Sequence, residues 1–292
     1  MKHPRIVAIV QARMSSRRLP GKILADIAGE PMLARVVDRL GRAKSVAKVV
    51  VATTLDPTDD ETEAVCQARD YPCYRGDVHD VLDRCYQAAR LYRAEVIVRI
   101  TADCPVIDPQ LVDEAASAFV GYPPGGKPPG ESAAGKFAFD FLANRLPPPW
   151  GRSYPIGLDT EVCAFEGLER AWREATEPHQ REHVMPYFYE GIPPEALRPS
   201  PQPRGSLMIA RATSPRGFRV GLLHHYPDYG GMRWTVDTLE DLELLRLIYA
   251  RFAGRDDFSW LEVLELLERE PGLVEINAAV THKHYRDIDE RR

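Results

Sequence analysis

Residues Ile6–Leu24 read IVAIVQARMSSRRLPGKIL, and the rest of the chain can be placed relative to this stretch. Its first part, IVAIV, is continuous, apolar and largely β-branched, which predicts a strand buried on both faces of a mainly parallel sheet. A loop rich in arginine and serine follows directly. Because open α/β sheets bind ligands at the carboxyl ends of their strands, the stretch predicts both a fold class and a binding site.

Four side chains of the loop are positively charged: Arg13, Arg17, Arg18 and Lys22. Guanidinium groups bind phosphate oxygens in pairs and an ammonium group acts as a point charge, so the loop suits a polyanion such as a triphosphate. Such a cluster can also be a solvated surface. Its position straight after a buried strand favours the binding site, although it matches neither G-x-x-x-x-G-K-[ST] nor G-x-G-x-x-G.

Composition limits the class of protein. The chain has 292 residues, 44% of them apolar, and a formal net charge of −5, which gives no general reason to bind nucleic acid. It contains no apolar run of the roughly 20 residues needed to span a bilayer, so we expect a cytoplasmic protein without a membrane contact. The five cysteines form no close metal-binding pair and no even disulfide framework.

Strand and helix patterns alternate along the first half of the chain. Buried strands are expected at 46–53, 73–77 and 95–100, and amphipathic helices at 31–40, 80–92 and 108–119. This alternation implies right-handed crossovers between parallel strands. The predicted fold is a doubly wound α/β sheet, with further strands expected around 156–162, 218–221 and 232–237.

Two aspartates follow predicted strands on the edge that carries the basic loop. Asp103 comes after strand 95–100, and Asp237 ends the segment Met232–Asp237, where Trp234 and Val236 alternate. Carboxylates beside a triphosphate can hold Mg²⁺. The alternative is that Asp103 caps a turn and that Asp237 or Thr238 caps the following helix.

Several segments resemble one enzyme family. The motif Ala12-Arg13-x-x-Ser16-x-Arg18-Leu19-Pro20-Gly21-Lys22 is similar to the signature of the sugar-acid cytidylyltransferases, and its longer form is most similar to the spore coat polysaccharide biosynthesis protein F branch. Further similar segments are GDVHDVLDR from Gly76, TADCPVIDP from Thr101 and RWTVDTLEDL from Arg233. Arg17 departs from the pattern, because relatives usually carry a small hydroxyl residue there.

The resemblance implies a Rossmann-like nucleotidyltransferase fold of the GT-A-like type with a small β-containing insertion. It also assigns roles. The implied nucleotide-binding residues are Ala12, Arg13, Ser16, Arg18, Lys22 and Arg84. The implied catalytic residues are Arg13, Lys22, Asp103 and Asp237, the last two as Mg²⁺ ligands. The implied sugar-binding residues are Asn144, Asp159, Glu161 and His183.

The activity implied is the joining of CMP from CTP to a sugar, expected to be a sugar acid, with release of pyrophosphate in surface polysaccharide biosynthesis. A glycosyltransferase that uses a finished nucleotide-sugar and a non-catalytic nucleotide- or sugar-binding module remain alternatives. Residues 1–255 are the expected nucleotidyltransferase domain, in which an insertion at 137–225 would bind the sugar and form a homodimer. Residues 256–292 are the expected helical extension, peripheral from Gly272 onward, and the Pro/Gly-rich segment 121–136 is expected to be a loop.

Overall fold

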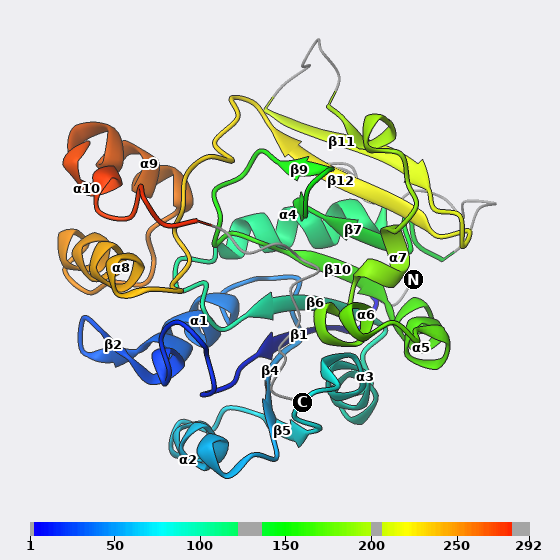
Figure 1. Ribbon diagram of the computed structural model, residues 1–292, viewed down its shortest axis with the longest axis horizontal. Helices are drawn as coiled ribbons and strands as arrows, with labels where there is room; N and C mark the ends of the chain where they lie inside the picture. Colours follow the sequence, from blue (N-terminus) through cyan, green and yellow to red (C-terminus); the bar gives the residue numbers. More distant parts are fainter. Residues whose placement is uncertain (1–2, 122–135, 200–205, 282–292) are drawn as a thin grey trace.

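The computed structural model describes residues 3–121, 136–199 and 206–281 (Figure 1). Most of the predicted loop 121–136 lies outside the described residues. Within them, the chain builds one eight-stranded sheet and two small two-stranded sheets. The strands of the main sheet, in spatial order, are β11 (Leu207–Thr213), β12 (Arg219–His225), β7 (Phe141–Ala143), β10 (Glu161–Ala164), β6 (Val96–Thr101), β1 (Ile6–Gln11), β4 (Lys48–Thr54) and β5 (Cys73–Gly76). The small sheets pair β2 (Asp26–Ile27) with β3 (Glu30–Pro31) and β8 (Arg145–Leu146) with β9 (Gly151–Arg152).

Strand β1 lies near the middle of the sheet and is buried on both faces, as its sequence predicts. Ile6, Ala8 and Val10 face one core cluster, whereas Val7 and Ile9 face the other. β1 runs parallel to β4 on one side and to β6 on the other. The chain first builds outward through β4 and β5 and then crosses back to β6. The gap between the ends of β1 and β6 is therefore a topological switch point, where open α/β sheets bind ligands.

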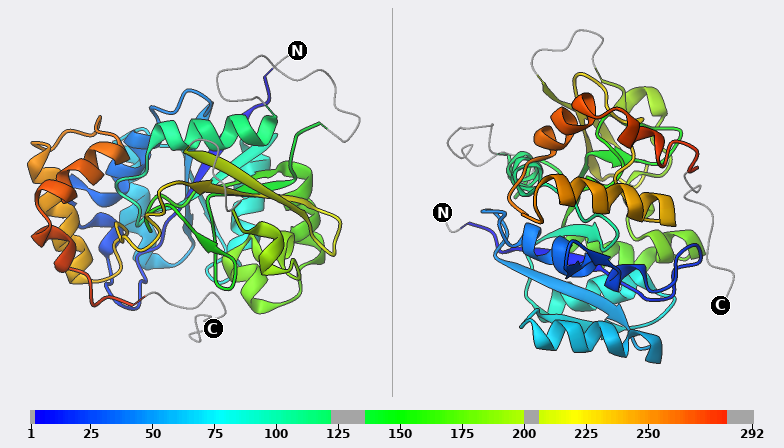
Figure 2. Two further views of the ribbon diagram at one scale, coloured as in Figure 1. Left: turned by 90° about the horizontal axis from the view of Figure 1, so that it is seen from above. Right: turned by 90° about the vertical axis from the view of Figure 1, so that its left-hand side faces the viewer.

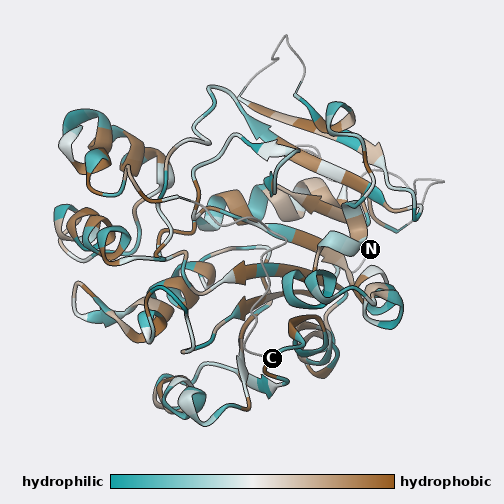
Figure 3. Cartoon of the chain, viewed as in Figure 1, coloured by the Kyte–Doolittle hydropathy of each residue, from teal (hydrophilic) through white to brown (hydrophobic). Residues whose placement is uncertain are grey.

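Helices cover both faces of the sheet, and apolar residues fill the layers between them (Figures 2 and 3). The first core cluster draws on α1 (Met32–Leu40), α2 (Asp60–Ala68), α4 (Pro109–Val120), α8 (Leu239–Arg251), α9 (Trp260–Arg269) and α10 (Gly272–Glu275). The second draws on α3 (Val81–Leu91), α5 (Phe165–Glu174) and α7 (Pro186–Tyr189). Helix α6 (Pro178–His183) packs against α3. The described residues also form three short 3-10 helices: η1 (Lys22–Leu24), η2 (Pro57–Asp59) and η3 (Pro194–Leu197). None of the described helices has the length and apolar character needed to cross a bilayer.

Two expectations about the second half of the chain are wrong. The segment 232–237 is not a strand, because it makes a single β-bridge, Ile156 to Arg233. Strands β7, β10 and β12 join the main sheet instead of forming a smaller β layer. Strand β11 lies at the edge of the main sheet. Helices α8 and α9 share the first core cluster with α1.

Candidate active site

The loop after β1 is a closed turn built around the backbone of Met14. The Met14 carbonyl accepts hydrogen bonds from the amides of Ser16 (2.8 Å) and Gly21 (2.9 Å). The Met14 amide donates to Asp59 Oδ1 at 2.8 Å, which ties the loop to the turn that follows β4. Gly21 has a φ of 73°, the left-handed region in which glycine is favoured. The sequence thus folds here into an anchored loop and not into a flexible basic surface.

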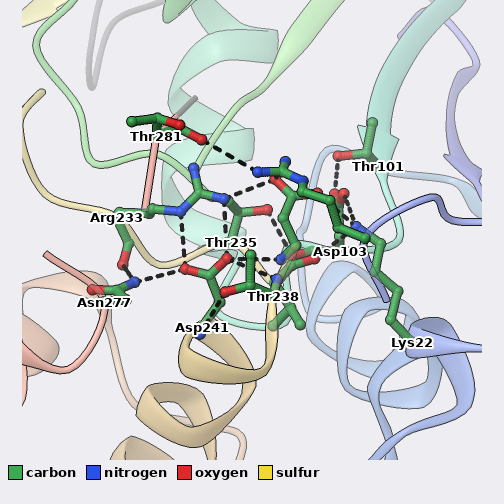
Figure 4. Close-up of polar contacts among 12 residues, drawn as sticks. Lys22, Thr101, Asp103, Arg233, Thr235, Thr238, Asp241, Asn277 and Thr281 are labelled. Atoms are coloured by element: carbon green, nitrogen blue, oxygen red, sulfur yellow. Dashed lines mark hydrogen bonds and ion pairs between the residues drawn. The ribbon is translucent and has the colours of Figure 1, made fainter. Parts of the chain in front are cut away.

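Lys22 lies where the three predicted segments meet (Figure 4). Its Nζ donates to Asp103 Oδ2 at 2.8 Å, to Asp237 Oδ1 at 2.9 Å and to the Val236 carbonyl at 2.6 Å. Burial by itself lowers the pKa of Lys22, but the two carboxylates outweigh burial and the pKa is raised. Lys22 is therefore a buried, permanently charged link between two acids that are far apart in the sequence.

The carboxylate of Asp237 has two further cationic partners. Arg18 approaches Oδ2 at 2.6 Å and Arg233 approaches the same oxygen at 2.8 Å. Burial opposes ionisation of this carboxyl group, yet Lys22, Arg18 and Arg233 together hold its pKa below the usual range. Asp237 is not the cap of α8, because the side chain of Thr238 accepts the Asp241 amide in a capping box. A structural capping role therefore does not explain Asp237.

Asp103 lies just past the end of β6, which places it next to the loop after β1. Its Oδ1 accepts a hydrogen bond from the Thr101 hydroxyl at 2.6 Å. Its backbone carbonyl accepts from the Val236 amide at 2.9 Å and from the Thr235 hydroxyl at 3.0 Å. These backbone contacts fix the distance between the segments that carry Asp103 and Asp237.

The two carboxylates suit Mg²⁺ in the way that nucleotide enzymes bind it. Mg²⁺ prefers oxygen ligands and is usually held by one or two carboxylates plus substrate phosphates. Asp103 and Asp237 point at one common atom, Lys22 Nζ, so both can face a single cation. The described residues contain no cluster of three or more His, Cys, Asp or Glu side chains with metal-binding geometry. A metal here would therefore depend on phosphate oxygens for its remaining ligands.

Arg84 lies on α3 and is fully buried. Its Nη1 donates to the Asp77 carbonyl, whereas Nε and Nη2 have no hydrogen-bond partner among the described residues. Burial, with Arg13 nearby, lowers the pKa of Arg84 to about 10. Buried guanidinium nitrogens without partners are costly, and such sites are often filled by a ligand. Arg84 and Arg13 are thus two neighbouring positive charges, which add to the loop a second cationic part of a site for an anion.

The four predicted sugar-binding residues lie on the other side of β6 and in the insertion. Asn144 is buried, and its amide group bonds to the Leu158 carbonyl (2.7 Å) and the Thr160 amide (2.8 Å). Asp159 pairs with Arg152 at 2.6 Å and lies 3.7 Å from Arg145.

Glu161, at the start of β10, is ion-paired with the partly buried Arg99. His183 ends α6, whose Arg181 is ion-paired with Asp80 at the start of α3. Burial and then the carboxylates of Asp103 and Asp159 raise the pKa of the Cys104 thiol.

Sequence reasoning missed three residues of this site. Asp59 makes no capping hydrogen bond to α2, and its side chain supports Met14 instead. Asp241 was read only as part of a motif, and it bonds to Arg233. Asn277 falls in the segment expected to be peripheral, yet it is 5% exposed and donates to Asp241 at 2.8 Å. Of these three residues, only Asp241 could have been found from a local sequence signal, because it lies in the capping box at the start of α8.

Comparisons with known proteins identify relatives of the chain. Residues 7–250 match the family model described as cytidylyltransferase. The chain is 30% identical over 271 residues to the spore coat polysaccharide biosynthesis protein SpsF of Bacillus subtilis, covering 91% of this chain and 95% of that protein. It is also 30% identical over 289 residues to an uncharacterised protein of Methanocaldococcus jannaschii, covering 98% and 100%.

Solved structures give the same result. A cytidylyltransferase from Leptospira borgpetersenii is 28% identical, has a TM-score of 0.74 and covers 97% of this chain and 100% of its own. A CMP:2-keto-3-deoxy-manno-octonic acid synthetase solved with CTP is 19% identical, with a TM-score of 0.55 and coverage of 85% and 99%. The second comparison shows a shared fold.

Proposed function

The chain belongs to the cytidylyltransferase family, and we propose that it transfers the cytidylyl group of CTP to a hydroxyl group of a sugar acid. The observation that carries this proposal is the meeting of Lys22, Asp103 and Asp237 at the switch point between β1 and β6. In the reaction, the sugar oxygen forms a bond to the α-phosphorus of CTP. The bond from that phosphorus to the bridging oxygen breaks, pyrophosphate leaves, and the hydroxyl proton passes to solvent.

The charges of the site support a metal–triphosphate complex as the substrate. The central cluster contains three cations and three carboxylates: Arg18, Lys22, Arg233, Asp103, Asp237 and Asp241. Because these charges balance, the carboxylates repel a bare triphosphate and the cations repel a bare metal ion. If the triphosphate enters with Mg²⁺, the cations would bind the phosphates and Asp103 and Asp237 would hold the metal.

Within this proposal the residues of the chain align and neutralise the triphosphate, which is the main task of an enzyme in phosphoryl-type transfer. Arg13, Arg18 and Lys22 bind phosphate oxygens, and Ser16 adds a hydroxyl donor. Arg84 contributes its two unpartnered donors to the nucleotide. Mg²⁺, when bound, neutralises charge on the α-phosphate. No side chain needs to act as a covalent nucleophile.

The region proposed to bind the sugar acid carries a small excess of positive charge. Arg99, Arg145 and Arg152 face two carboxylates, Asp159 and Glu161. This excess favours an acceptor with a carboxylate over a neutral sugar. We therefore propose that the sugar acid binds near the start of β10, within reach of Asp159, Glu161 and His183, while Asn144 shapes that segment through its backbone contacts.

We further propose a cytoplasmic homodimer that pairs through the 137–225 insertion. Strand β11 supports the pairing surface, because it lies at the edge of the sheet with one partner strand, β12, and its side chains are half-buried or exposed. An exposed edge of this kind is a template for another chain. Light scattering on the purified protein should give twice the mass of 32.9 kDa.

Pyrophosphate release tests the activity. The protein is incubated with Mg²⁺, each of the four nucleoside triphosphates in turn, and a panel of sugar acids that includes 3-deoxy-manno-octulosonate. We expect pyrophosphate and a CMP-sugar with CTP and one acid, and none without the acid. A protein that uses a finished nucleotide-sugar, or that only binds nucleotides, would release no pyrophosphate under any of these conditions.

A further inference from the structure

Asn277 lies beyond residue 250, where the family match ends, yet it reaches the proposed active site (Figure 4). It follows α10 and is 5% exposed. Its Nδ2 donates to Asp241 Oδ1 at 2.8 Å and to the Arg233 carbonyl at 3.0 Å. One amide group thus joins the end of the described chain to two residues that are adjacent to Asp237.

Asp241 needs this donor because its carboxylate is completely buried. Oδ2 accepts from the amides of Asp237 (2.9 Å) and Thr238 (3.1 Å) and from Arg233 Nη2 (3.0 Å). Oδ1 accepts from Arg233 Nε at 2.9 Å and from Asn277. Removal of Asn277 would leave Oδ1 with one donor, Arg233 Nε, and would weaken the constraint on the orientation of the buried carboxylate.

A rotation of Asp241 is transmitted to Asp237 by two routes. Arg233 Nη2 binds both carboxylates, at 3.0 Å to Asp241 and 2.8 Å to Asp237. The backbone amide of Asp237 itself donates to Asp241. The orientation of Asp237 toward Lys22 therefore depends on a residue that touches neither the nucleotide loop nor Asp103.

The same segment also contacts the nucleotide loop. The carbonyl of Thr281 accepts a hydrogen bond from Arg18 Nη1 at 3.2 Å, as Figure 4 shows. Arg18 is at the same time paired with Asp237. Asn277 thus contacts the site through its side chain, and Thr281 contacts it through its backbone carbonyl.

We propose that Asn277 is a positioning residue for the cytidylyl transfer: it holds the Arg233–Asp241 pair, which orients Asp237. This inference rests on the proposed function. The competing explanation is that Asn277 only packs the C-terminal segment. Leu273 provides the matched control, because it is buried in the same segment but belongs to the apolar core and not to the polar network.

The test compares the full-length wild type with Asn277→Ala, Asn277→Asp and Leu273→Ala. Asn277→Asp keeps the size of the side chain and replaces the donor with a charge that repels Asp241. Three quantities are measured: the thermal unfolding midpoint, the affinity for Mn²⁺ in the presence of CTP by electron paramagnetic resonance, and kcat and KM for CTP with the active sugar acid.

We expect Asn277→Ala to lower kcat and the Mn²⁺ affinity about tenfold, because small misplacements of a catalytic group have effects of at least this size. KM for CTP should change less than threefold, since Arg13, Lys22 and Arg84 are untouched. Asn277→Asp should show a larger loss. Leu273→Ala should lower the unfolding midpoint at least as much as Asn277→Ala and keep wild-type kinetics and Mn²⁺ affinity.

The inference is wrong if Asn277→Ala stays within twofold of the wild type in kcat and Mn²⁺ affinity, or if Leu273→Ala loses both to the same extent. If Asn277→Asp does not fold, Asn277→Ala decides. Failure of the proposed function is a separate result, because the wild type itself would then release no pyrophosphate from CTP.

Discussion

Arg84 and Arg39 are both completely buried, but their surroundings are opposite. The donors of Arg39 are satisfied by the carbonyls of Ile107, Asp256 and Phe258 at 2.7–2.9 Å. Two nitrogens of Arg84 have no hydrogen-bond partner in the described part of the chain. A buried arginine that is poorly satisfied costs stability, and enzymes retain such groups where a ligand completes them.

Arg84→Met and Arg39→Met should therefore have opposite effects. We expect Arg84→Met to leave the free energy of unfolding equal or about 1 kcal/mol higher, and to raise KM for CTP at least about tenfold. Arg39→Met should lower the free energy of unfolding by about 3 kcal/mol, because it leaves two buried carbonyls and one partly buried carbonyl without donors. Urea unfolding and steady-state kinetics measure both. A structural role for Arg84 would instead appear as a loss of stability without a change in KM.

Lys22 determines how stability depends on pH. Its pKa is raised from 10.5, so its contribution is complete below that value and is lost as pH rises through the raised pKa. The pKa of Asp237 is lowered from 3.8, so its contribution is complete above that value and is lost as pH falls through the lowered pKa.

Lys22→Met should lower the free energy of unfolding at pH 7 by about 3 kcal/mol, because two carboxylates lose the cation between them. The gap between the wild type and this variant should be constant between pH 3.8 and pH 10.5 and should narrow on both sides. Urea unfolding at a series of pH values measures the gap. A gap that changes steadily between pH 5 and pH 9 would show that another group controls it.

At the scale of the element, the loop after β1 depends on the turn after β4. Asp59 Oδ1 accepts the Met14 amide at 2.8 Å and is 1% exposed. Asp56, in the same turn, caps η2 by accepting the Thr58 amide at 2.9 Å, a contact made within the turn itself. Substitution of each aspartate in turn can therefore distinguish support of the loop after β1 from the local stability of the turn after β4.

Asp59→Ala should lower kcat/KM for CTP between about 10-fold and 100-fold, because the phosphate-binding groups lose their fixed position. Asp56→Ala should cost about 1 kcal/mol of stability, the usual effect of a lost cap, and keep wild-type kinetics. Kinetics on both variants decide between the two roles. Equal kinetic losses would mean that the turn acts as a whole and that Asp59 has no special role.

The elements also show what the sequence could predict. β1 and the capped start of α8 were predictable, because a continuous apolar run and a capping box are local signals. The segment Met232–Asp237 was predicted to be a strand because Trp234 and Val236 alternate. Both side chains are buried, but by tertiary packing, and the segment makes one β-bridge. The role of Asp59 could not be predicted, since its partner Met14 is 45 residues away and contributes only a backbone amide.

At the scale of the whole molecule, the C-terminal helices complete the fold. Arg39 on α1 donates to carbonyls at Asp256 and Phe258, and Trp260 and Leu267 lie in the core cluster that covers one face of the sheet. The expected boundary at residue 255 cuts through this core. This packing could not be predicted from the sequence, because a helix that packs on its own domain has the same apolar pattern as a helix of a separate extension.

A chain truncated after Arg255 should therefore fail to fold, and the full-length protein should unfold in one transition. Calorimetry measures the number of transitions, and near-ultraviolet circular dichroism measures the packing of the truncated chain. A truncated chain with native packing and a cooperative transition would show that residues 1–255 are an independent domain.

The central claim is that the loop after β1, Asp103 and Asp237 bind one metal–triphosphate complex at the edge of the sheet. A crystal structure of the protein with CTP and Mn²⁺, with anomalous scattering to locate the metal, tests it most directly. We predict one Mn²⁺ at about 2.2 Å from oxygens of both Asp103 and Asp237, with the triphosphate on Arg13, Arg18 and Lys22. Mn²⁺ bound away from either aspartate, or a triphosphate bound outside the loop, would contradict the account.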